Sequence, residues 1–371
     1  MRLYITWYIL LYYPVGNLYN VQVLGKMISC LKVKRHDKDE TEEGDKTFFT
    51  KNGGALLEEL IALRNGKSNP IRRFSAKELL IATNNYHGCQ IFVKDCGYQL
   101  YKGSLKDRPI VVKTYGNDQH PRAKFAGTAN PYKDIAIGSQ MSVHNNVLKV
   151  IGCCLETQQP TVVYEFVGTK SLSTCISATN NVEPLPWKCR LKIAKDLANA
   201  IAYLHTAFSR PVIHRDIKSS NIILDQNNVP KITDFGLSIS IPEGQLHVQC
   251  GSAPGIKKFI PPEYLVSGYL TEKVDVYNFG MLLFELLSGQ EPSYYLFKVG
   301  NVLHSRSRCV EKLGDVVDCR IRNEGFRLEQ FQGFNTLLLR CISHDEEERP
   351  TMTEVAKELR LIHQNLSNTL L

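Results

Sequence analysis

Hydrophobic residues recur in the second half of the chain with the spacing of buried helices. From Trp187, apolar side chains return every three or four residues, through Leu191 and Leu197 to Leu204. This spacing places them on one face of a helix, so the pattern predicts a long helix with one buried side. Similar patterns predict further helices near residues 274–289, 331–343 and 353–365.

The first half of the chain carries short β-rich runs instead. They cover about residues 90–116 and 147–167, and a helical stretch near residues 131–142 separates them. A small β-rich lobe followed by a larger helical lobe is the order that these runs predict. We therefore expect an α+β fold with two lobes, over about residues 74–167 and 168–365.

A helix start is encoded just before the first β-rich run. Ser75 can cap the helix, and Glu78, three residues later, can reach back to complete a capping box. Phe74, which precedes the cap, can pack onto Leu79 as a hydrophobic staple.

The N-terminal region is harder to interpret. Tyr4 to Val15 is apolar and aromatic, but it is shorter than the ~20 apolar residues that a membrane span needs. Met27 opens a polar segment, and we interpret residues 1–26 as an unusual extension or a gene-model error. Residues 27–73 are then a tail and linker, and residues 36–54 have the polar, glycine-containing composition of a linker.

Composition narrows the class of protein. Of 371 residues, 43% are hydrophobic and 22% are charged, which is typical of a globular chain. The net charge of +8 is too small and too scattered to indicate nucleic-acid binding. The 11 cysteines have no regular spacing, so we expect reduced thiols and a cytoplasmic protein. Cys30 beside a basic cluster is compatible with lipid attachment at the plasma membrane, although a solvated tail is the favoured interpretation.

Two motifs in the helical half contain candidate catalytic residues. Residues 214–221 read His-Arg-Asp-Ile-Lys-Ser-Ser-Asn, and residues 234–236 read Asp-Phe-Gly. Together they resemble the catalytic loop and the metal-binding motif of protein kinases. Further matches follow the order of that family: a strand lysine at Lys113, Pro-Pro-Glu ending at Glu263, Asp-Val-Tyr-Asn-Phe-Gly beginning at Asp275, and Arg349, expected to pair with Glu263.

The resemblance assigns a role to each residue of these motifs. Asp216 would accept the proton of a substrate hydroxyl, and Lys218 would steady the γ-phosphate of ATP. Asn221 and Asp234 would hold Mg²⁺, and Lys113 would grip the α- and β-phosphates. The position of Lys218 indicates the serine/threonine class.

Further positions follow from the same resemblance. Asp134 aligns with the helix glutamate that pairs with the strand lysine. Tyr164 stands at the gatekeeper position beside the hinge residues Glu165 and Val167, which would line the adenine pocket. Gly97 is the one glycine near the expected phosphate loop. Arg215 could receive a phosphate from the activation segment, for which Ser252 is a candidate.

Within the kinases, the chain resembles plant receptor-like kinases over about residues 46–365. Residues 152–156, 163–166 and 240–244 are similar to the wall-associated-kinase branch. Residues 69–75, Asn-Pro-Ile-Arg-Arg-Phe-Ser, resemble the narrower ZED-related group of receptor-like cytoplasmic kinases and pseudokinases. This resemblance implies partnership with an NLR immune receptor and other receptor-like cytoplasmic kinases, and sensing of pathogen effectors.

Several positions depart from a working kinase. Counting back from Gly103, the three glycines of the phosphate loop fall on Val93, Asp95 and Tyr98. Side chains there obstruct the approach of phosphate to backbone N–H groups. Asp134 is one carbon shorter than the usual glutamate. The threonine before the closing motif aligns with Ile256, and Lys258 replaces a glycine of the substrate platform.

Two functions remain open from the sequence. The chemical residues favour an ATP- and Mg²⁺-dependent serine/threonine kinase. The departures lie in the nucleotide grip and the substrate platform, and they favour a pseudokinase-like adaptor with weak or no phosphate transfer. We expect the adaptor.

Overall fold

The computed structural model describes residues 40–64, 71–95, 97–116, 129–177, 183–250, 260–292, 317–322 and 328–364, with side chains described from residue 47 onward except those of Arg64 and Pro262. Contacts divide the chain into residues 1–44 and residues 45–371, and the fold below is that of the second unit. Several expectations fall outside the described residues: those on residues 1–39, on Ser252 and on residues 255–258. Among the described helices, none is long and apolar enough to cross a membrane.

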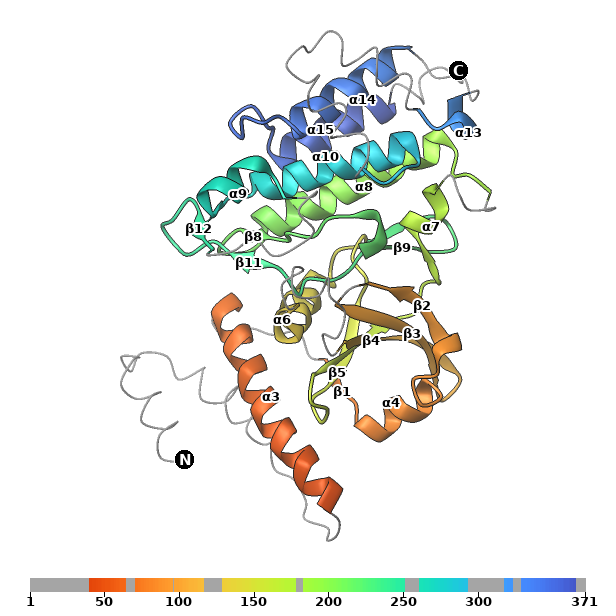
Figure 1. The fold of residues 1–371 in the computed structure, drawn as a ribbon, viewed down its shortest axis with the longest axis vertical. Coiled ribbons are helices and arrows are strands. Elements are labelled where there is room, and N and C mark those ends of the chain that lie inside the picture. The colour runs from red at the N-terminus through yellow and green to blue at the C-terminus, as the bar shows by residue number, and fades with distance from the viewer. Residues whose placement is uncertain are drawn as a thin grey trace. The chain divides into compact units, whose positions relative to one another are not determined.

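A six-stranded sheet forms the first lobe, in the order β1-β5-β6-β4-β3-β2 (Figure 1). β1 runs parallel to β5, and the other neighbours are antiparallel. The sheet confirms both predicted β-rich runs. Its strands are β1 (Arg72–Arg73), β2 (Ile91–Lys94), β3 (Tyr98–Leu105), β4 (Arg108–Tyr115), β5 (Val150–Cys154) and β6 (Thr161–Glu165).

The two faces of the sheet belong to two different cores. Tyr101 and Val112 pack in one cluster with Leu79 of helix α4 (Ala76–Ala82). Leu100 and Val111, their neighbours along the strands, belong to the main core with helix α6 (Pro131–Met141). This alternation is the period of two expected for strands. It brings α6 and the inner face of β4 into one core.

The predicted helix start at α4 is confirmed. Ser75 Oγ accepts a hydrogen bond from the backbone N–H of Glu78 at 3.2 Å, and the Glu78 carboxylate accepts one from the N–H of Ser75 at 2.9 Å. Phe74 and Leu79 are buried in the same cluster, as the staple requires.

Strand β5 is packed tightly against β1 and the ring of Phe74. A Cβ at Gly152 would lie 2.1 Å from the carbonyl oxygen of Arg72 and 2.4 Å from the Phe74 ring, so only glycine lets β1 approach. The next residues, Cys153 and Cys154, are buried, as predicted. Burial raises the pKa of Cys153 to about 12, so it stays a protonated thiol.

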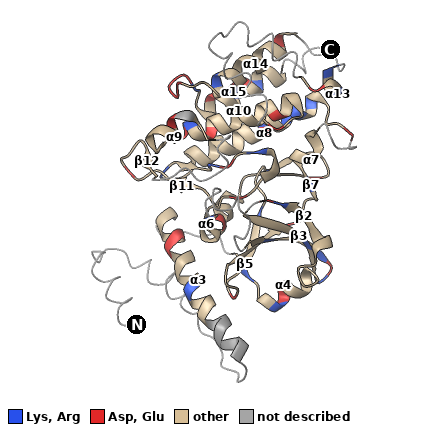
Figure 2. Ribbon diagram, viewed as in Figure 1, with Lys and Arg blue, Asp and Glu red and all other residues tan. Residues whose placement is uncertain are grey.

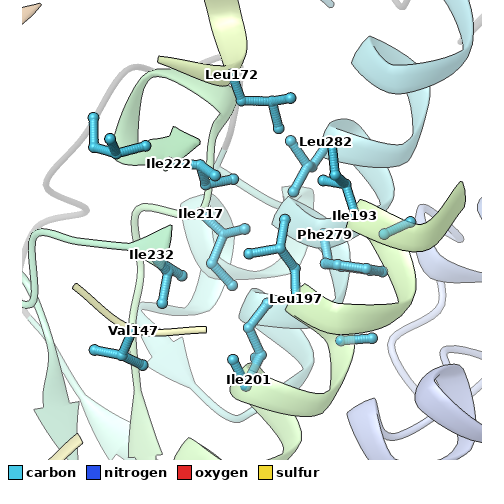
Figure 3. Close-up of a cluster of buried hydrophobic side chains, with 14 of the residues drawn as sticks. Val147, Leu172, Ile193, Leu197, Ile201, Ile217, Ile222, Ile232, Phe279 and Leu282 are labelled. Atoms are coloured by element: carbon cyan, nitrogen blue, oxygen red, sulfur yellow. The ribbon is translucent and has the colours of Figure 1, made fainter. Parts of the chain in front are cut away.

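The second lobe is helical, as predicted. Its main helices are α8 (Trp187–Thr206), α10 (Lys273–Ser288), α14 (Leu328–Cys341) and α15 (Met352–Gln364). Figure 3 shows side chains of α8 and α10 meeting those around the catalytic loop: Ile193, Leu197, Ile201, Phe279, Leu282, Ile217, Ile222 and Ile232.

Short elements connect the strands and helices of both lobes. They are η1 (Gly88–Gln90), β7 (Lys170–Ser171), α7 (Leu172–Ile176), β8 (Val212–Ile213), η2 (Ser219–Asn221), β9 (Ile222–Leu224), β10 (Pro230–Ile232), β11 (Ile239–Ser240), β12 (Val248–Gln249), α9 (Pro262–Ser267), β13 (Tyr269–Leu270) and α13 (Cys319–Arg322). Acidic and basic residues are interspersed over the elements of both lobes in Figure 2.

The expected linker over residues 36–54 is corrected by the structure. Residues 40–64 form one helix, α3 (Glu40–Arg64), which runs through Gly53 and Gly54. Neither glycine has a neighbour within 4 Å of a Cβ, so both lie on open parts of the helix. The face that carries Asn52, Leu56 and Leu63 is buried, and its tertiary packing stabilises a helix that the glycines disfavour.

Candidate active site

The catalytic loop is held in place by α10. Asp275 is fully buried and accepts hydrogen bonds from the backbone N–H groups of His214 at 2.7 Å and Arg215 at 2.8 Å. His205 Nε2 lies 2.8 Å from the same carboxylate. Burial opposes ionisation, but these hydrogen bonds and the nearby histidines outweigh it and lower the pKa of Asp275. The charged carboxylate therefore anchors the loop that carries Asp216.

The predicted pairing of Arg349 with Glu263 is confirmed. Arg349 Nη1 and Nη2 donate to the two carboxylate oxygens of Glu263 at 2.6 and 2.8 Å. Such a forked pair fixes geometry as well as charge. It ties the closing motif of the activation segment to the loop before α15.

Lys113 of β4 lies between two carboxylates. Its Nζ is 2.6 Å from Asp134 Oδ2 of α6 and 2.6 Å from Asp234 Oδ1. Although the Asp134 side chain is one carbon shorter than the usual glutamate, α6 brings it into direct contact with Lys113. The three side chains are 0%, 0% and 4% exposed.

Burial and charge act in opposite directions on this triad. Burial disfavours the ammonium of Lys113, yet the two carboxylates outweigh it and raise its pKa. Burial likewise opposes the Asp134 carboxylate, but Lys113 and the hydrogen bonds it receives lower its pKa. For Asp234, burial and the negative charges of Asp134 and Asp216 outweigh Lys113 and raise the pKa.

Three tyrosines enclose the triad. Tyr115 and Tyr164 donate their hydroxyls to Asp134 Oδ2 at 2.6 and 3.2 Å. The ring of Tyr98 covers the ammonium, with Lys113 Nζ 4.2 Å from its centroid, within the range of a cation–π contact. Burial raises the pKa of all three phenols well above the usual value, so they remain neutral donors.

Tyr98 also reaches the residue expected to hold Mg²⁺. Its hydroxyl donates to Asn221 Oδ1 at 2.6 Å. Asn221 Nδ2 in turn donates to the backbone carbonyl and to Oδ2 of Asp216, both at 2.8 Å. The carboxamide oxygen that a metal would need is therefore bonded to the phenol.

Asp95 binds the lysine expected at the γ-phosphate. Lys218 Nζ lies 2.9 Å from Asp95 Oδ2 and 2.8 Å from Asp216 Oδ2. Burial lowers the pKa of Lys218, but the two carboxylates outweigh it and raise the pKa above its usual value. The Asp95 carboxylate, in the β2–β3 hairpin, thus binds the ammonium of Lys218 that was expected to bind a phosphate.

These residues do not fit Mg-ATP in the arrangement described. The residue types suit the family's cofactor, since asparagine, aspartate and lysine are the groups that hold magnesium and phosphates. Their atoms, however, bond to one another and to Tyr98 and Asp95. Nucleotide could enter only if the β2–β3 hairpin moved away from the catalytic loop.

The other predicted nucleotide positions, Glu165, Val167 and Gly97, lie at or beside strands of the sheet. Glu165 ends β6, where its N–H donates to the carbonyl of Lys149 at 2.9 Å, and Val167 is half-buried against the main core. Gly97 lies in the turn between β2 and β3, and its carbonyl accepts from Gly116 N–H at 3.2 Å. A Cβ at Gly97 would meet nothing within 4 Å, so no close backbone approach requires glycine there.

Arg215, the predicted phosphate receptor, is bound to neutral groups. It donates to the carbonyl of Leu237 and to the hydroxyl of Tyr264, both at 3.1 Å. Its buried Nε has no hydrogen-bond partner among the described residues. The role of Arg215 stays a prediction, as does that of Ser252.

The contacts of three residues in the site, Tyr115, Tyr98 and Asp95, were not predicted. Tyr115 lies two residues after Lys113 on β4, so strand periodicity already placed the two side chains on one face. The sequence marked Tyr98 and Asp95 only as glycine replacements. Their contacts with Asn221 and Lys218 depend on how the two lobes close, which no local pattern encodes.

Comparisons with known proteins agree with this architecture. The family described as protein tyrosine and serine/threonine kinase matches residues 91–359. The serine/threonine-protein kinase ZRK1 of Arabidopsis thaliana is 37% identical over 345 residues, which cover 90% of this chain and 96% of that protein. The non-functional pseudokinase ZED1 of the same plant is 38% identical over 330 residues, covering 85% and 96%. The putative wall-associated receptor kinase-like 16 is 34% identical over 370 residues, covering 97% and 82%.

These relatives confirm both levels of the resemblance drawn from the motifs. Their names include kinases and a pseudokinase, so the group does not decide activity. The chain belongs to the protein kinase family, within its ZED-related group of kinases and pseudokinases.

Proposed function

We propose that this chain is a pseudokinase-type signalling adaptor that transfers little or no phosphate. The observation that carries the proposal is the bond between the Tyr98 hydroxyl and Asn221 Oδ1. Phosphoryl transfer depends on metal ions and cations that neutralise the phosphates. Here the residues that would hold the metal and the phosphate are bonded within the chain: Asn221 accepts a hydrogen bond from Tyr98, and Lys218 forms an ion pair with Asp95.

The proposed partner is an NLR immune receptor in the cytoplasm, together with other receptor-like cytoplasmic kinases. Support comes from membership of the ZED-related group and from the similarity to a non-functional pseudokinase. In this role the kinase fold acts as a binding surface in plant innate immunity. A pathogen effector, or a kinase modified by one, is the proposed signal.

A competent serine/threonine kinase is the second candidate. Asp216 remains beside Lys218 at 2.8 Å, and Lys113 keeps its ion pair with the helix residue Asp134. ZRK1, named a serine/threonine-protein kinase, is similar in sequence to this chain over most of its length. In this alternative, opening of the hairpin would admit ATP and Mg²⁺.

Transfer of labelled γ-phosphate, to the chain itself and to a generic basic protein, separates the two candidates. The matched control is Asp216→Asn, which removes the proton acceptor and keeps the side chain's size. The adaptor proposal expects equal background incorporation in both proteins. Incorporation that disappears in Asp216→Asn would establish the kinase and overturn the proposal.

Binding of nucleotide is tested by the melting temperature with Mg-ATP. The wild type should show no rise, whereas Tyr98→Gly should gain up to ~2.7 kcal/mol of stability when ligand is 100-fold above its dissociation constant. Tyr98→Phe keeps the ring over Lys113 and loses only the hydroxyl that binds Asn221. It therefore distinguishes the effect of the ring from the effect of the hydrogen bond. A rise in the wild type would contradict the closed site.

The adaptor role needs a binding measurement. The full chain should be captured by the leucine-rich-repeat domain of an NLR receptor from the same plant. Asp216→Asn should bind equally well, because the role proposed here does not use transfer. Failure with every candidate receptor would refute the NLR part of the proposal, whatever the result of the phosphate assay.

A further inference from the structure

Helix α3 has a buried face that the proposed function does not use. Asn52, Leu56 and Leu63 are buried, and Phe49 and Leu60 pack partly buried on the same core. Their spacing of three or four residues places all five on one side of the helix. α3 is therefore packed on the kinase domain along most of residues 49–63.

Asn52 joins α3 to two separate elements of the first lobe. Its Nδ2 donates to the carbonyls of Leu155 and Thr157, both at 2.9 Å, in the turn between β5 and β6. Its Oδ1 accepts the hydroxyl of Tyr132 at 2.8 Å. Asn52 is 1% exposed, so loss of these bonds would leave buried polar groups unpaired.

The contact with Tyr132 falls in the first turn of α6, two residues before Asp134. Nine of the 11 residues of α6 are buried. A sheet can cover only one side of a helix, and a helix buried all round needs cover on its other sides. Figure 1 shows α3 beside α6, where it can provide part of that cover.

The C-terminal end of α3 reaches the second lobe. Arg210, in the loop after α8, donates from Nη2 to the carbonyl of Ala62 at 2.8 Å. A cation near the last carbonyls of a helix is favourable, because those carbonyls have no partner within the helix. α3 thus contacts the β5–β6 turn, α6 and the second lobe.

We infer that residues 45–64 are an internal clamp that fixes α6 and keeps Asp134 on Lys113. Displacement of α3 frees the first turn of α6, separates the buried ion pair and opens the cluster to solvent. The clamp gives the site a regulatory input far from the nucleotide position. The inference does not depend on whether the chain transfers phosphate.

The test measures how fast Lys113 reacts with a small amine-reactive reagent, by mass spectrometry on the folded full chain. Asn52→Ala removes all three bonds of the carboxamide. It should raise the labelling rate of Lys113 about tenfold or more, because buried groups left unpaired favour the displaced state. Hydrogen exchange over residues 131–141 should rise in the same variant. Lys51→Ala, on the exposed face of α3, is the matched control and should change neither rate.

A second variant distinguishes local opening of the site from unfolding of the whole protein. Tyr132→Phe keeps the ring and removes one hydrogen bond, so it should raise Lys113 labelling by a smaller factor with the same melting transition. Faster exchange over α3 with unchanged labelling of Lys113 in Asn52→Ala and Tyr132→Phe would overturn the inference. No nucleotide or partner is used, so this failure is distinct from a failure of the proposed function.

Discussion

Lys113 is held by groups that belong to the chain itself. Two carboxylates, at 2.6 Å each, and the ring of Tyr98 surround its ammonium group. In a working kinase the same ammonium faces the phosphates of ATP. In this chain its first role is structural, since it neutralises two buried negative charges.

Replacement of Lys113 should therefore lower the free energy of unfolding. Lys113→Met leaves Asp134 and Asp234 buried beside each other without a cation, and breaking a buried pair in this way costs about 3–5 kcal/mol. Urea unfolding followed by circular dichroism should show this loss. Lys77→Met, at an exposed position of α4, should change stability little. A Lys113→Met protein as stable as the wild type would contradict the structural role.

Residue types in the site were predictable, whereas their bonds were not. The ordered motifs identified Lys113, Asp216, Asn221 and Asp234, because phosphoryl transfer restricts which residue types can stand there. The contact of Tyr98 with Asn221 joins residues 123 positions apart. Sequence patterns report local periodicity, so they do not encode such a contact.

At the scale of elements, local signals were reliable where they agreed with packing. The cap at Ser75, the staple of Phe74 and the periodicity of α8 all lie where the sequence placed them. α3 was missed because its glycines and polar residues favour a linker, while the buried face that stabilises it is set by tertiary contacts.

The cap of α4 gives a prediction at this scale. Ser75→Ala removes the acceptor of the Glu78 N–H and should lower the free energy of unfolding by about 1 kcal/mol. Thermal or urea unfolding measures the loss. Ser75→Asp, which can still accept that bond, should keep most of the stability. A loss as large in Ser75→Asp as in Ser75→Ala would show that the cap bond is not the cause.

At the scale of the molecule, the β2–β3 hairpin joins the lobes without a ligand. Asp95 and Tyr98 belong to the first lobe, and their partners Lys218 and Asn221 belong to the second. We predict that Mg-ATP leaves the hydrogen exchange of residues 91–105 unchanged in the wild type. In the double variant Asp95→Gly/Tyr98→Gly, hydrogen exchange of residues 91–105 should be faster than in the wild type without nucleotide. It should become slower when Mg-ATP is added. Protection of the wild-type hairpin by Mg-ATP would refute lobe closure by the chain alone.

Acid should weaken the anchor between α10 and the catalytic loop. The pKa of Asp275 in the folded protein lies below its ordinary value of 3.8. Its charge therefore stabilises the fold above that value, and the contribution is lost as pH falls through the lower, folded pKa. Asp275→Asn should be less stable than the wild type at pH 7, with a difference that shrinks below about pH 4. A difference that stays constant down to pH 3 would contradict this assignment.

The enclosure of Lys113 by Tyr98 also affects how this protein can be detected. Chemical surveys that collect kinases on reactive nucleotides depend on a strand lysine that the reagent can reach. A phenol ring and two carboxylates cover the ammonium of Lys113, so such a reagent would not label this chain. An inventory of kinases made in that way would omit it.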